Sequence, residues 1–189
     1  HVRATTGSPV QMTNCHPFNH REWLFVHNGL VNEYDRVHRD LAFAVAPELF
    51  PFIRGTTDSE LMILLALSFG LDTDVFTGIA RMAGLVEYVA AQHEIEEALQ
   101  MTLGISNGES LYAARYSTVG KSRSLYYSAS HNAAMEIAPG AGKFSSDARA
   151  IVSEPLSSLA SEWVPVPEAS VLSITKGEIS CKPFAPIAP

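Results

Sequence analysis

The sequence predicts an α+β fold, in which helices pack against an antiparallel sheet. Two segments with apolar residues at helical spacing, residues 58–69 and 74–93, precede a region of alternating apolar and polar residues that starts near Met101. The turn signals Asn107-Gly108 and Lys176-Gly177 divide that region into hairpins. Because tight hairpins join antiparallel strands, this order indicates a helix layer on an antiparallel sheet.

The first part of the chain predicts little regular structure. Residues 1–21 are polar and contain several glycine, proline and asparagine residues, so we expect an irregular segment. Residues 22–27 (EWLFVH) are rich in aromatic and β-branched residues and predict a short strand, which Asn28-Gly29 would end. Residues 30–42 place apolar side chains at spacings of four, three and four and predict a helix.

The next two helices differ in their expected burial. Thr57 and Glu60 have the spacing of a capping box, and the helix that follows runs through Phe69. That helix is apolar on nearly all sides, so we expect it to be buried, with Gly70 closing it at positive φ. Residues 74–93 have one apolar stripe and one polar face, which predicts a half-exposed helix.

The rest of the chain predicts strands and one long loop. Residues 130–146 are rich in small residues and predict a loop, and the proline-containing tail 183–189 is expected to be extended. We find no internal repeat and expect one domain over residues 1–189. The predicted strands are residues 101–105, 111–117, 124–129, 150–153, 171–174 and 179–181.

The composition excludes several classes of function. With 47% hydrophobic and 17% charged residues, the chain can form a sizeable core. A net charge of -7 argues against binding to nucleic acid or to an anionic membrane, and no apolar segment is long enough to span a bilayer. Cys15 and Cys181 lack metal-binding spacing, so we expect no metal or cofactor, and a disulfide between them has little support. Without a signal-peptide pattern, the chain is expected in the cytoplasm.

Four short segments form a pattern that is specific when taken together. They are residues 1–7 (HVRATTG), 14–18 (NCHPF), 26–29 (VHNG) and 55–60 (GTTDSE). This set resembles the glutaminase domain of class II glutamine amidotransferases, and residues 115–116 and 152–156 resemble the smaller, stand-alone members, which include γ-glutamyl amidohydrolases of the ergothioneine pathway. The resemblance implies an N-terminal-nucleophile (Ntn) hydrolase fold, αββα with two stacked antiparallel sheets, of which this chain is expected to lack the first strands.

The resemblance also implies a reaction and a set of site residues. The family hydrolyses the side-chain amide of glutamine through a thioester on an N-terminal cysteine, whose own α-amine acts as base. The Asn28 side chain and the Gly29 N–H would form the oxyanion hole. Arg3 would bind the α-carboxylate of the substrate, Thr6 would add a contact beside it, and Asp58 would hold the α-ammonium.

The sequence departs from the family pattern in its nucleophile, which the pattern places far upstream of Arg3. Cys15 is internal and has no free α-amine, so we do not assign it that role. We therefore expect no glutaminase activity from these 189 residues alone and the full mechanism from a longer protein that carries the cysteine. Glutamine or a γ-glutamyl small molecule is the expected ligand; release of ammonia to a separate synthase and assembly into a homo-oligomer stay open.

Other interpretations of the same residues stay open as well. Asn28-Gly29 is also typical of a hairpin turn. Asp58 is also consistent with a first-turn carboxylate that the helix dipole favours, and Arg3 with an ordinary surface charge. His16 and His27 are expected to shape the fold rather than to transfer protons. The alternative function is a non-catalytic glutamine-binding or protein-interaction module, which keeps the substrate-binding residues Arg3 and Asp58 but lacks the nucleophile.

Overall fold

A computed structural model describes residues 11–137, 145–155 and 162–189 of the chain. The helices are α1 (Tyr34–Phe43), α2 (Asp58–Ser68), α3 (Val75–Gln92) and α4 (His131–Ile137), with 3₁₀ turns at Met12–Asn14 and Phe50–Phe52. The strands are β1 (Phe18–His20), β2 (Trp23–Val31), β3 (Leu99–Ser106), β4 (Ser110–Ser117), β5 (Tyr126–Ser128), β6 (Ile151–Val152), β7 (Trp163–Pro165), β8 (Ser170–Thr175) and β9 (Glu178–Pro183). The α+β class predicted from the sequence is confirmed.

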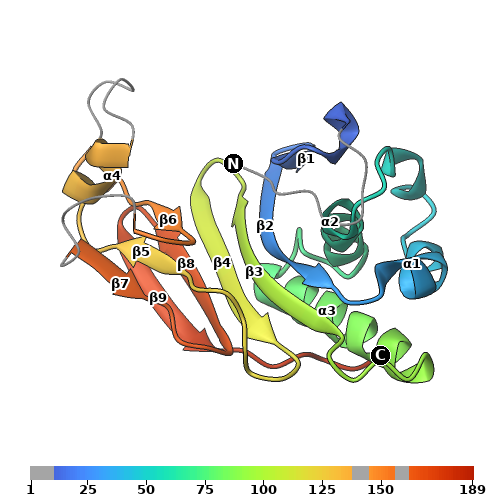
Figure 1. Ribbon diagram of the computed structural model, residues 1–189. Coiled ribbons are helices and arrows are strands. Elements are labelled where there is room, and N and C mark those ends of the chain that lie inside the picture. Colours follow the sequence, from blue (N-terminus) through green and yellow to red (C-terminus); the bar gives the residue numbers. More distant parts are fainter. Residues whose placement is uncertain (1–10, 138–144, 156–161) are drawn as a thin grey trace.

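Two antiparallel sheets form the middle layers of the molecule (Figure 1). The large sheet has the strand order β1-β2-β3-β4-β8-β9, and the small sheet has the order β6-β5-β7. Helices α1, α2 and α3 cover one face of the large sheet, while the small sheet lies against its other face and α4 packs on β5 (Figure 1). The order of layers is therefore αββα.

Neighbouring residues of β4 and β8 show that the large sheet is buried on both faces. Ala114 and Val171 belong to the core that contains the helices. Ala113 and Leu172, one position away on the same strands, pack in a separate core with Leu125, which immediately precedes β5 of the small sheet. Because successive side chains of a strand point to opposite faces, the two cores lie on opposite sides of the sheet.

The structure corrects the prediction that Asn28-Gly29 ends the second strand. β2 continues to Val31, because β3 pairs with it over this whole length, with Asn28 opposite Thr102 and Gly29 opposite Met101. The hairpin-turn interpretation of Asn28-Gly29 is therefore wrong. The helix predicted from residue 30 begins only at Tyr34, after Glu33 has turned the chain with a φ of 47°.

Three other elements differ from the sequence prediction. β1 lies in the segment expected to be irregular, where it forms a tight hairpin with β2. β7 was not predicted, and α4 occupies part of the expected loop 130–146, whose residues 138–144 lie outside the described part of the chain. In the turn at Asn107-Gly108 only the glycine has a positive φ, and the Asn107 side chain accepts hydrogen bonds from the Glu109 and Ser110 N–H groups.

Helix α2 is buried on every side, as predicted, and its N-terminus is held by two side chains. The Thr57 hydroxyl accepts a hydrogen bond from the Glu60 N–H at 3.2 Å. The Glu60 carboxylate does not return the bond to Thr57 but accepts from the N–H groups of Arg54, at 3.1 Å, and Gly55, at 2.8 Å. Glu60 thus fixes the loop that leads into the helix.

Replacing Glu60 with alanine should destabilise the protein by about 2–3 kcal/mol, because two backbone donors near a buried carboxylate lose their acceptor. Urea unfolding followed by circular dichroism measures the change. Glu96→Ala is the control, since Glu96 is exposed, and it should alter the free energy of unfolding by less than about 0.5 kcal/mol. Equal effects of the two substitutions would contradict this role of Glu60.

Candidate functional site

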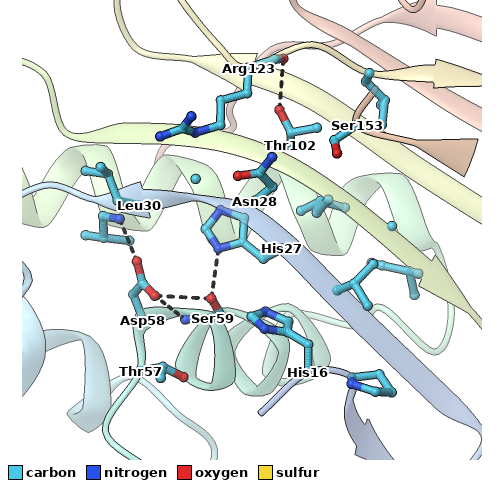
Figure 2. Close-up of a pocket in the computed structure, with 18 of the residues that line it drawn as sticks. His16, His27, Asn28, Leu30, Thr57, Asp58, Ser59, Thr102, Arg123 and Ser153 are labelled. Atoms are coloured by element: carbon cyan, nitrogen blue, oxygen red, sulfur yellow. Dashed lines mark hydrogen bonds between the residues drawn. The ribbon is translucent and has the colours of Figure 1, made fainter. Parts of the chain in front are cut away.

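A groove of about 1470 Å³ opens where β2 and β3 meet the N-terminus of α2 (Figure 2). Asn28, Gly29 and Asp58, which lie far apart in the sequence, all line it. Residues 152–154, from the segment that resembles stand-alone family members, line it as well. The structure therefore brings together three of the five site residues expected from the sequence. The other two, Arg3 and Thr6, lie outside the described residues.

One edge of β2 is open along the groove. β1 pairs with β2 only from Trp23 to Phe25, and in the described part of the chain no strand continues along that edge. The Asn32 N–H donates to the Ala98 carbonyl just beyond the end of β3, whereas the Val31 N–H donates to Asp58. Since N–H groups alternate in direction along a strand, the Gly29 N–H points the same way as that of Val31, toward the open edge.

Gly29 is required by the close approach of its neighbours. A Cβ at this position would lie 2.0 Å from the Gln100 carbonyl oxygen and 2.7 Å from His27 Nε2. Both distances are far shorter than any real contact, and the first involves backbone, which moves only if the β2–β3 pairing changes. The glycine that the sequence suggested as a turn residue is instead a strand residue with no room for a side chain.

Asp58 joins the helix end to the strand edge. Its Oδ1 accepts hydrogen bonds from the Ser59 N–H at 2.7 Å and from the Ser59 hydroxyl at 3.1 Å, and its Oδ2 accepts from the Val31 N–H at 2.9 Å. Each carboxylate oxygen has two acceptor positions, so Oδ2 keeps one for a further donor. The side chain is half-buried and lines the groove, which leaves a negative charge available there. Its place in the first turn of α2 agrees with the helix-dipole interpretation too.

His27 and Ser59 are linked to Asp58 by hydrogen bonds (Figure 2). Both are buried, and His27 Nδ1 lies 2.9 Å from the Ser59 hydroxyl oxygen. Burial lowers the pKa of the His27 imidazole, an effect that the nearby Asp58 carboxylate opposes. Burial of the ring thus favours its neutral form. Neither residue was predicted to belong to the site. His27 follows Trp23 and Phe25 at the spacing of a buried strand face, which indicates that its side chain is buried.

The cysteines contribute nothing to the described groove. Cys15 and Cys181 are exposed and not joined in a disulfide, and Cys15 Sγ donates to the Gln11 carbonyl rather than lining the groove. Within the described residues, no cluster of His, Cys, Asp or Glu side chains is arranged to bind a metal ion. None of the helices in that part of the chain has the length and apolar character needed to cross a membrane.

Known proteins resemble this chain over almost its whole length. The family model for class II glutamine amidotransferases matches residues 1–187. The probable glutamine amidotransferase DUG3 of Saccharomyces cerevisiae is 28% identical over 210 residues, a match that covers 97% of this chain and 58% of the yeast protein. The chain thus spans little more than half the length of this curated relative.

Solved structures show the same arrangement of layers. A glutamine aminotransferase class-II domain protein from Silicibacter pomeroyi is 33% identical with a TM-score of 0.81, over 94% of this chain and 74% of that one. The glutamine phosphoribosylpyrophosphate amidotransferase of B. subtilis is 15% identical with a TM-score of 0.65, over 98% of this chain and 34% of that one. These likenesses confirm the Ntn-hydrolase fold that the sequence motifs implied.

Proposed function

Because this chain belongs to the class II glutamine amidotransferase family, we propose that the protein hydrolyses the γ-amide of glutamine or of a γ-glutamyl compound. One observation carries the proposal. The Asp58 carboxylate and the Gly29 N–H lie along the same edge of β2, which supports an ammonium site at Asp58 next to an oxyanion donor at Gly29. In this proposal, Asn28 supplies the second donor to the oxyanion from the groove side of the strand.

The spacing along this edge is of the same order as the length of a γ-amide side chain. Asp58 is bound at Val31, and Val31 and Gly29 are two residues apart, or about 6.8 Å at roughly 3.4 Å per residue. In glutamine, four bonds of about 1.5 Å separate the α-nitrogen from the amide carbon, so an extended side chain spans about 5 Å. An ammonium bound to Asp58 would then present the amide carbonyl to the Gly29 N–H.

The proposed reaction uses an N-terminal cysteine, a position that neither Cys15 nor Cys181 occupies. Its α-amine takes the thiol proton and the thiolate attacks the amide carbon, while the negative charge on the carbonyl oxygen is stabilised by the Asn28 amide and the Gly29 N–H. The protonated amine passes this proton to the amide nitrogen, the C–N bond breaks and ammonia leaves. Water then hydrolyses the thioester, which releases glutamate and restores the thiol. Arg3 and Thr6 would hold the α-carboxylate of the substrate, opposite the ammonium site at Asp58. The ammonia is either transferred to a separate synthase or released.

The first test compares glutamine with asparagine as substrates of the full-length protein. Asparagine has one methylene fewer and cannot reach both Asp58 and Gly29, so its kcat/KM should be at least about 100-fold lower than that of glutamine. Ammonia release coupled to a dehydrogenase gives both values. Alkylation of the N-terminal cysteine, located by intact mass and N-terminal sequencing, should stop the reaction.

Two results would count against the proposal. Similar values of kcat/KM for glutamine and asparagine would show that the site does not select substrates by the length of the side chain. A native N-terminus without cysteine, together with tight glutamine binding and no glutamate release, would support the alternative of a non-catalytic binding module.

A further inference from the structure

The side chains of His27, Ser59 and Asp58 form a chain of hydrogen bonds that ends at the groove (Figure 2). His27 comes from β2, while the other two residues come from the first turn of α2. All three residues line the groove, but His27 and Ser59 are buried, whereas Asp58 is half-buried and keeps a free acceptor position. The chain therefore runs from two buried side chains to the carboxylate that is open to a ligand.

The direction of these hydrogen bonds follows from the acceptor at the end. An ionised carboxylate can only accept, so the Ser59 hydroxyl donates its single hydrogen to Asp58 Oδ1. The hydroxyl oxygen must then accept from His27 Nδ1, which assigns the proton of the neutral imidazole to Nδ1. His27 Nε2 is 3.4 Å from the Gln100 carbonyl oxygen, too long for a strong competing bond.

We propose that His27 and Ser59 are positioning residues, which orient the Asp58 carboxylate so that Oδ1 is fully occupied and Oδ2 is presented to the substrate ammonium. This inference rests on the proposed function, since it assigns the supports of the ammonium site in that reaction. It explains why a histidine lies on the apolar face of β2: the imidazole is the donor that turns the Ser59 oxygen toward Asp58.

Another serine in the same helix has a similar number of hydrogen bonds but lies away from the groove. The Ser68 hydroxyl, at the other end of α2, donates to the carbonyl of Leu64 one turn earlier and accepts from the Ala46 N–H at 2.9 Å. Ser68 does not line the groove. Ser68 is therefore a matched control for the loss of a serine hydroxyl from α2.

The experiment measures glutamine hydrolysis by the full-length protein and its variants. Ser59→Ala should raise KM for glutamine about tenfold while kcat changes less than about twofold, because a hydrogen bond to a charged group is lost at the binding site. Ser59→Thr, which keeps the hydroxyl, should stay within about threefold of the natural protein, and Ser68→Ala within about twofold. His27→Asn, whose amide places a donor near Nδ1, should retain more affinity than His27→Ala.

Two further measurements separate positioning from a general structural effect. Ser59→Ala should not change kcat/KM for glutaramate, the glutamine analogue without the α-ammonium. It should also cause no further loss when added to Asp58→Ala, since the two residues act through one interaction.

An unchanged KM in Ser59→Ala, or an equal loss of kcat/KM with and without Asp58, would overturn the positioning role of His27 and Ser59 while leaving the proposed function intact. If the natural protein neither bound nor hydrolysed glutamine, the proposed function and the positioning role would both be overturned.

Discussion

Replacing Asp58 with alanine should lower kcat/KM for glutamine between about 30-fold and about 4000-fold, with most of the loss in KM. Removing one partner of a desolvated charge pair typically costs about 2–5 kcal/mol, and each 1.4 kcal/mol is about tenfold in affinity. Asp58 has a free acceptor position in the groove, so the substrate ammonium would lose the carboxylate that is bound to the edge of β2. Steady-state kinetics with glutamine and with glutaramate measure the effect, and glutaramate should be far less affected.

Asp74→Ala is the control, because Asp74 is also a carboxylate at a helix N-terminus, the N-cap of α3, but does not line the groove. Its carboxylate accepts from the N–H groups of Phe76, at 3.1 Å, and Thr77, at 3.2 Å. We expect it to cost about 1 kcal/mol of stability and to leave glutamine kinetics unchanged. If Asp58→Ala behaved in the same way, Asp58 would only be a first-turn carboxylate favoured by the helix dipole, and its assignment to the substrate ammonium would be wrong.

Gly29→Ala should abolish detectable hydrolysis and destabilise the protein by about 3 kcal/mol. The added methyl group would meet the Gln100 carbonyl and His27 Nε2, so β2 must move away from β3 at the point where the Gly29 N–H is needed. Even a shift of about 1 Å at such a donor is expected to cost about 100-fold in rate. Urea unfolding and glutamate release test the two parts separately.

Gly104→Ala provides the comparison, since Gly104 lies in β3 of the same sheet but has more room. A Cβ there would meet only Val26 Cγ2, at 3.2 Å, and a small side-chain adjustment can relieve that contact. We expect a loss of less than about 1 kcal/mol and nearly normal activity. Comparable damage in the two variants would mean that any alanine in this sheet is harmful and that Gly29 has no special role.

Helices α2 and α3 were predictable from the sequence because their signals are local. The capping residues Thr57 and Asp74 and the apolar spacing that follows each of them lie within one or two turns. The continuation of β2 was not predictable in this way, because Asn28-Gly29 is a strong local turn signal. Its actual partner strand is some seventy residues further along the chain, at Met101 and Thr102. Pairing with β3 overrides the local preference.

The residues of the site also divide into those that were predictable from the sequence and those that were not. Asn28, Gly29 and Asp58 were expected from a pattern of motifs, and the structure places all three at one groove. His27 and Ser59 were missed, because their roles depend on which helix end meets which strand edge, and 32 positions separate them in sequence. A buried histidine in a strand indicates a polar partner somewhere, but the sequence alone does not identify that partner.

The open edge of β2 also bears on solubility. An unpaired strand edge is a template on which another chain can add a strand, and natural proteins often block such edges with a charged side chain. Here Asp58 occupies the Val31 N–H, so an incoming strand would have to displace a carboxylate and leave Oδ2 without its backbone donor. In the proposed assignment, the residue that selects the substrate also opposes strand addition at this edge, so selection for either property would preserve the other.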